Sequence, residues 1–189
     1  MQYLLLILHN RLIMKKLLFA LSCAAISFSI ASCAYKQAKN YNNETNADQE
    51  GLAFIKNGIE GGLTEIKASS LAITNSSNPR VLSLAKMMIN DHTTAGNELQ
   101  KIKNDKDVMS EDRISTPHME MINALSEKKG AEFDKAYIEM MVDDHEKAVE
   151  LFAGATRNNA PEIEDFAKKT LPTIQMHLDS SKAVLASLK

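Results

Sequence analysis

Cysteine is almost absent from this 189-residue chain: Cys23 and Cys33 are its only two, and both lie near the N-terminus. The rest of the chain therefore forms no disulfide and holds no thiol that could act as a nucleophile or a metal ligand. Its stability has to come from a hydrophobic core.

Other signatures are missing as well. There is no tryptophan, the formal net charge is only −2, and no block of like charges indicates a nucleic-acid partner. We find no glycine-rich phosphate loop and no Gly-x-Ser-x-Gly nucleophile motif. No stretch alternates β-branched and polar residues with the two-residue period of a strand, so we expect an all-α protein.

The first 32 residues have the pattern of a targeting segment. Residues 14–32, beginning MKKLLFALSC, contain the two lysines, the apolar run and the small residues of a secretory signal peptide. Residues 1–13 resemble an over-long start. The alternative is a membrane helix over residues 1–32, which polar and basic residues interrupt.

The signal ends in IASC, which resembles a bacterial lipobox, and this resemblance implies that Cys33 carries a lipid. We then expect an exported lipoprotein of a Gram-negative bacterium, in the outer membrane or the periplasm, that contacts the membrane through this lipid. The alternative is an ordinary cleaved signal with an incidental cysteine. Residues 33–48 are polar, which predicts a flexible tether before a domain over residues 49–189.

Helical periodicity runs through that domain. We expect four long helices, over residues 49–74, 79–104, 131–157 and 161–187, and a short one from Thr116 to near Gly130. Asn78 and Pro79 suit an N-cap and a first helical turn. Because the longer connection joins the second and third long helices, the sequence predicts a ferritin-like four-helix bundle with a short extra helix in the crossover. A line of small residues on the first helix, including Gly58 and Gly61, would let a neighbouring helix approach closely.

Three histidines fall on the apolar faces of three different helices, near their middles. They are His92, His145 and His177, and Glu65 has the same place on the first helix. Antiparallel helices of equal length bring their middles to one level, so we expect these four side chains to meet in the core. Imidazole and carboxylate groups are ligands for transition metals such as zinc, copper or iron. His118, on the short helix, is expected at the surface.

The phrase MMINDH at 87–92 returns as MMVDDH at 140–145. Met88 and Met141 lie one turn before the histidines, either as core residues or as additional sulfur ligands that would favour copper(I). Asp91 and Asp144 would flank the core. There they would either accept a hydrogen bond from a histidine of the next helix or form ion pairs between helices.

A di-iron oxidase or ferritin site requires Glu-x-x-His on two helices. Ile89 and Val142 occupy the positions of those glutamates in this chain. The sequence therefore argues against that chemistry, identifies no catalytic residue and favours a binding protein over an enzyme.

Residues 48–188 resemble the bacterial "domain of unknown function 4142" family. The matching phrases are AKMMINDHTTAGNEL (85–99), FDKAYIEMMVDDHEKAVELF (133–152) and LPTIQMHL (171–178). The resemblance implies an exported, ferritin-like helical protein, and members are often described as outer membrane proteins.

Two functions stay open at this point. The first is a lipid-anchored envelope bundle that binds a transition metal at the mid-helix level without catalysing a reaction. The second is a structural or stress-related envelope protein, whose buried histidines form only a hydrogen-bonded core cluster. The sequence names no protein partner for either.

Overall fold

A computed structural model describes residues 46–188. The signal segment, Cys33 and most of the expected tether lie outside the described residues. Within residues 46–188, no helix combines the length and the apolar character needed to cross a membrane.

The described residues form five helices, and the prediction of an all-α bundle is confirmed. They are α2 (Gln49–Asn75), α3 (Pro79–Asp105), α4 (Thr116–Ser126), α5 (Gly130–Ala155) and α6 (Pro161–Ser187). The helix α6 continues through Pro172. One boundary differs from expectation: Gly130 does not end the short helix but begins α5, with a φ of 54° that favours glycine.

The starts of α2 and α3 follow from local side chains. The carboxylate of Asp48 accepts a hydrogen bond from the backbone N–H of Gly51 at 2.7 Å, and Asn78 accepts one from Arg80 at 3.0 Å. Pro79 stands in the first turn of α3, where its missing N–H costs nothing. Asp48 was expected in the tether, so the end of that segment already belongs to the fold.

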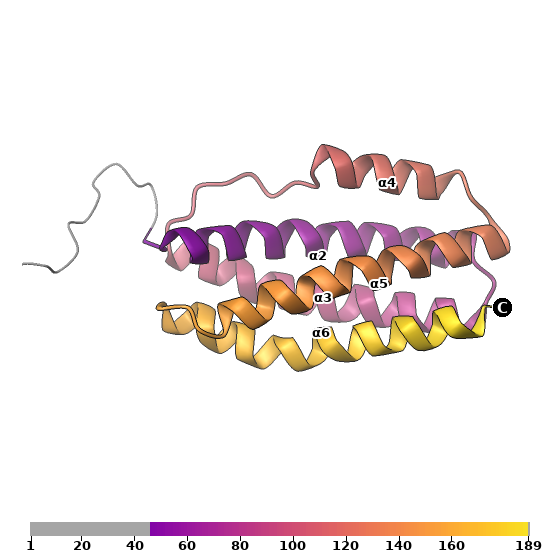
Figure 1. The fold of residues 1–189 in the computed structure, drawn as a ribbon. Coiled ribbons are helices and arrows are strands. Elements are labelled where there is room, and N and C mark those ends of the chain that lie inside the picture. The colour runs from indigo at the N-terminus through magenta and orange to yellow at the C-terminus, as the bar shows by residue number, and fades with distance from the viewer. Residues whose placement is uncertain (1–45, 189) are drawn as a thin grey trace, which may run out of the picture. The chain divides into compact units, whose positions relative to one another are not determined.

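The helices pair as two hairpins, α2 with α3 and α5 with α6. Contacts of α2 with α5 and of α3 with α6 close the bundle, and Figure 1 shows α4 lying outside it, against α2 and α5. The short helix therefore covers one seam between the two hairpins.

The small residues of α2 have two different consequences. A Cβ added at Gly58 would lie 2.8 Å from Cδ2 of Leu99, so this side chain of α3 packs directly on the glycine. A Cβ added at Gly61 would meet no atom within 4 Å. The prediction of a close approach is therefore correct at Gly58 and wrong at Gly61, which lines a cavity.

The core consists of two apolar halves separated by a polar layer. One half contains Phe54, Phe152 and Phe166, whose ring centroids are 5.0, 6.0 and 6.1 Å apart. The other contains Met88 and Met141 among aliphatic and aromatic side chains. Between the two halves, each long helix contributes one buried ionisable residue to what we call the polar layer: Glu65, His92, His145 and His177.

Candidate metal centre

The polar layer brings together the four side chains that the sequence places near the middles of four helices. Their exposed fractions are 4% for Glu65, 6% for His92, and 0% for both His145 and His177. The imidazole centroids are 5.2 Å apart for His92 and His177, 5.3 Å for His145 and His177, and 5.5 Å for His92 and His145. Three rings and one carboxylate thus share a single level in the bundle.

Glu65 contacts two of the three imidazoles. Its Oε2 lies 2.9 Å from Nε2 of His92, and its Oε1 lies 3.1 Å from Nδ1 of His145. Burial by itself would raise the pKa of Glu65, but His92, His145 and His177 outweigh it and lower that pKa to about 2. The layer therefore holds a carboxylate anion in the middle of the bundle.

Fixed acceptors determine where two of the ring protons are. Nδ1 of His145 lies 2.9 Å from the backbone carbonyl oxygen of Met141, which can only accept, so this nitrogen carries a proton. Nε2 of His177 lies 3.0 Å from Oδ2 of Asp91. Burial would raise the pKa of Asp91, but hydrogen bonds from His177 and Asn90 lower it, so the carboxylate is ionised and His177 donates through Nε2.

The two remaining nitrogens of these rings face each other. Nε2 of His145 and Nδ1 of His177 are 3.3 Å apart. In the neutral rings both of these nitrogens carry a lone pair and neither carries a proton, so the contact is repulsive unless something positive lies between them. Burial lowers the pKa of both His145 and His177, which disfavours an additional proton as that positive group.

The third imidazole of the layer, that of His92, is held differently. Its Nε2 pairs with Oε2 of Glu65 at 2.9 Å, but this contact does not have the geometry of a hydrogen bond. Burial acts to lower the pKa of His92, and the negative charge of Glu65 outweighs it and raises that pKa. A buried ring nitrogen without a well-formed hydrogen bond is costly, and the His92 ring lies beside the facing pair of His145 and His177.

The three rings have the spacing of a ligand set. One ring nitrogen from each of His92, His145 and His177 lies within 4.8 Å of the other two. Among the described residues, this is the single group of histidine and carboxylate side chains with that spacing. The three histidines could hold a metal ion, and the Glu65 carboxylate, which the sequence predicts as a fourth ligand, lies beside them without belonging to this group.

The other residues singled out in the sequence lie around this layer. Met88 and Met141 are fully buried and pack within one apolar half of the core, where Met141 also offers its backbone carbonyl to His145. Asp91 accepts a hydrogen bond from a histidine of another helix. Asp144 instead pairs with Lys147 of its own helix, at 3.2 Å.

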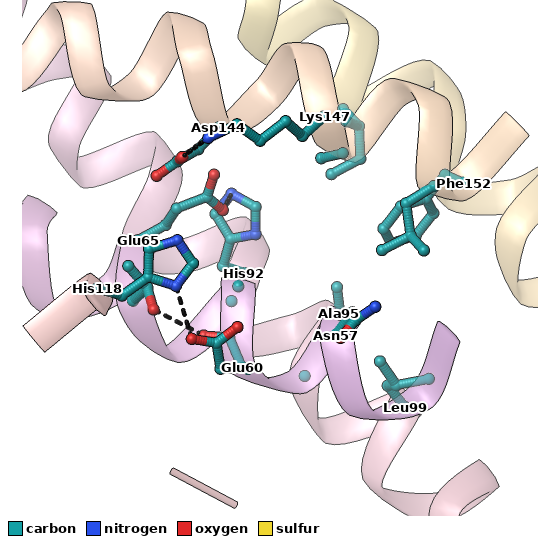
Figure 2. A pocket seen from close by; sticks show the side chains of 18 of the residues that line it. Asn57, Glu60, Glu65, His92, Ala95, Leu99, His118, Asp144, Lys147 and Phe152 are labelled. Atoms are coloured by element: carbon teal, nitrogen blue, oxygen red, sulfur yellow. Dashed lines mark hydrogen bonds and ion pairs between the residues drawn. The ribbon is translucent and has the colours of Figure 1, made fainter. Parts of the chain in front are cut away.

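A cavity of about 310 Å³ adjoins the polar layer, and its presence could not be read from helical periodicity. Figure 2 shows Glu65 and His92 in its lining, with Asp144 and Lys147 on one side and Glu60 and His118 on another. Nδ1 of His118 lies 2.6 Å from Oε1 of Glu60, and the His118 side chain is 26% exposed. The expectation that His118 lies at the surface therefore missed its pairing with Glu60.

Comparison with solved structures finds similar folds at low sequence identity. A DUF305 fragment from Deinococcus radiodurans has a TM-score of 0.67 and 16% identity, over 75% of this chain and 98% of that one. A DUF305 protein from Streptomyces coelicolor, described as a candidate secreted protein, has a TM-score of 0.63 and 12% identity, over 74% and 93%. CopM in its Cu(II)-bound form has a TM-score of 0.63 and 18% identity, over 74% and 97%. At these identities the likeness concerns the fold alone.

Comparison with curated proteins finds no match. The family of the domain of unknown function DUF4142 matches residues 36–184. This match covers all of α2 to α5 and most of α6.

Proposed function

The chain belongs to the DUF4142 family, and we propose that its bundle binds a divalent transition-metal ion, with copper(II) as the first candidate. The ion would lie between His92, His145 and His177, with Glu65 beside them. The protein would act as a binding protein of the cell envelope, for storage, sensing or protection, and not as an enzyme.

The observation that carries this proposal is the 3.3 Å separation between Nε2 of His145 and Nδ1 of His177. Two nitrogens that bind one ion at 2.0–2.1 Å are about 3.3–3.4 Å apart in the tetrahedral geometry of zinc and about 2.9 Å apart in the square-planar geometry of copper(II), so copper(II) requires the two rings to move closer. An ion between them would accept both lone pairs, which otherwise repel each other. A ring nitrogen of His92 would supply a third ligand.

Copper(II) is preferred for two reasons. Imidazole suits copper, zinc, iron and nickel, and a given nitrogen and oxygen site binds copper(II) most tightly among the divalent metals of that series. The fold neighbour CopM has a Cu(II)-bound form, although its 18% identity carries no ligand over to this chain. Zinc is the comparison metal.

The same proposal places the domain at a membrane of a Gram-negative envelope, held by a lipid on Cys33. Its support is the sequence alone: the secretory signal over residues 14–32 and the lipobox-like IASC. The polar residues 34–45 would separate the lipid from the bundle.

A hydrogen-bonded core cluster is the second candidate function of the layer. It is favoured by the unbroken chain of contacts from Met141 through His145 and His177 to Asp91. This alternative needs a proton between His145 and His177, against the lowered pKa of both.

The test is a copper titration of the full-length protein, purified in detergent, stripped of metal, and titrated against a chromophoric chelator. We expect one copper(II) per wild-type chain and loss of this binding in the double variant His145→Asn, His177→Asn. The variant His118→Asn is the matched control, because it removes a carboxylate-paired histidine outside the layer and should still bind one copper(II).

A thermal melt followed by circular dichroism establishes that each variant is folded. If the asparagine variant does not fold, the pair His145→Leu, His177→Leu replaces it, because it removes the same ligands without burying new polar groups. Wild-type protein that takes up neither copper(II) nor zinc(II) would overturn the proposal and leave the core-cluster function.

A further inference from the structure

The polar layer is buried, and the cavity adjoins it from one side. Glu65 and His92 line the cavity, whereas His145 and His177 do not and are 0% exposed. A ligand that reaches the layer through this cavity would therefore meet the His92 and Glu65 side first. The Nε2 of His92, which is more than nine-tenths buried and contacts Glu65 without the geometry of a hydrogen bond, belongs to that side.

Glycines on α2 and α3 make room for the cavity. Gly61 lies one turn before Glu65 on α2, and Gly96 lies one turn after His92 on α3, and both line the cavity. A Cβ added at either position would meet no atom within 4 Å. The cavity volume of about 310 Å³ is far above the ~10–15 Å³ that one water requires by the same measure, so a hydrated ion can be accommodated.

Three carboxylates line the cavity, together with the ammonium group of Lys147. The carboxylates are those of Glu65, of Glu60 and of Asp144, which accepts a hydrogen bond from Lys147 at 3.2 Å. Glu60 accepts from the backbone N–H of Ser115 at 2.9 Å and contacts His118 at 2.6 Å. The remaining lining is largely apolar. Carboxylates therefore lie both at the layer and toward the crossover, as Figure 2 shows.

We infer that this cavity is the access chamber of the metal site. A hydrated divalent cation would pass between the carboxylate of Asp144 and the Glu60–His118 pair. It would then reach His92 and Glu65. This inference rests on the proposed copper binding. The inference assigns a role to Gly61 and Gly96, which keep the cavity open. A larger side chain at either position should slow the passage of the ion and leave its ligands unchanged.

The test compares rates and affinities of copper(II) uptake by stopped-flow transfer from a coloured chelator to the full-length protein. Gly96→Leu fills the chamber, and Gly154→Leu is the matched control, since Gly154 also has free space around its added Cβ but does not line the cavity. We expect Gly96→Leu to slow association at least about tenfold. Because dissociation slows as well, the equilibrium affinity should change much less. Gly154→Leu should alter neither quantity.

Two further variants complete the test. Asp144→Asn should slow uptake by a smaller factor, because it removes one carboxylate from the cavity lining without filling the cavity. Gly61→Val repeats the plug from α2 in case Gly96→Leu does not fold.

Unchanged association rates in both plugged variants would overturn the access chamber while leaving copper binding intact. If the two plugged variants also lost equilibrium affinity for copper(II) while their association rates stayed unchanged, the cavity would be part of the bound state and not an access path. Wild-type protein that binds no copper removes the proposed function and this inference together.

Discussion

Nε2 of His177 on α6 lies 3.0 Å from Oδ2 of Asp91 on α3, so this hydrogen bond joins helices of the two different hairpins. The equivalent aspartate of the repeated phrase, Asp144, makes no such contact and pairs with Lys147 of its own helix. Similar local sequences therefore give two aspartates with different partners, because Nε2 of His177 faces Asp91 of α3, whereas its Nδ1 faces His145 of α5.

We expect Asp91→Asn to weaken copper(II) binding by about 10–100-fold, the usual effect of removing an outer hydrogen-bond partner of a ligating histidine. Asparagine keeps an oxygen acceptor but loses the charge that makes the imidazole of His177 a better ligand. A competition titration measures the affinity. Asp179→Asn is the control, because it changes an exposed carboxylate on α6, the helix of His177. This variant should bind copper(II) like wild type. Equal affinities of the two variants would show that Asp91 has no part in metal binding.

Replacing Glu65 with glutamine should lower the pKa of His92 in metal-free protein. Burial lowers that pKa, and the negative charge of Glu65, with a smaller contribution from Asp91, outweighs it, so removing the Glu65 charge should lower the pKa. In wild type this pairing stabilises the fold fully below pH 6.5, and the stabilisation is lost as pH rises through the raised pKa. NMR titration of the imidazole protons measures the change, and an unaltered His92 pKa in Glu65→Gln would contradict it.

Glu60 should make the docking of α4 sensitive to acid. Burial would raise the pKa of Glu60, but hydrogen bonds from Ser115 and His118 outweigh it and lower that pKa. The stabilisation is therefore complete above pH 4.5 and is lost as pH falls through the lowered pKa. Because the group is partly exposed, we expect up to about 1 kcal/mol between wild type and Glu60→Gln at pH 7.

Urea unfolding at several pH values measures this difference, which should shrink toward zero below pH 4. Glu98→Gln is the control, at a surface carboxylate that pairs with Lys169 far from α4. A difference that stays constant from pH 7 to pH 3 would show that the charge of Glu60 does not hold the crossover.

Met88→Leu and Met141→Leu should leave copper(II) affinity unchanged. Both methionines are fully buried among the apolar residues of one core half, so we expect them to act as packing residues. Each leucine variant should cost less than about 1.5 kcal/mol of unfolding free energy, and each alanine variant about 2–5 kcal/mol. A leucine variant with wild-type stability but weakened copper binding would identify that methionine as a sulfur ligand.

Helical periodicity predicts the level of the polar layer well. The spacing of apolar residues fixes which side of each helix faces inward, and equal helix lengths then bring the positions of Glu65, His92, His145 and His177 to one height. Local side-chain chemistry likewise predicts the start of α3 at Asn78 and Pro79. These features depend on short stretches of chain, which is why they can be read from the sequence.

The features that were missed depend on the path of the crossover and on small differences in helix separation. The pairing of His118 with Glu60 requires α4 to dock on α2, and no periodicity in residues 106–129 sets that position. Gly58 and Gly61 are one turn apart on α2, yet only the first is covered by Leu99. A difference of one side-chain width in the distance between two helices decides whether a glycine is covered or lines a cavity. The spacing of residues in the sequence does not determine that distance.

The polar layer also limits how the four helices can slide past one another. If one helix moved along its axis by a turn, its ionisable residue would enter an apolar half and lose its partners, and a buried charge without a partner is strongly destabilising. The apolar halves alone would tolerate many such shifted packings. Glu65 and the three histidines therefore fix the register of the bundle, so that the residues proposed to bind the metal also select one fold among its near-equivalents.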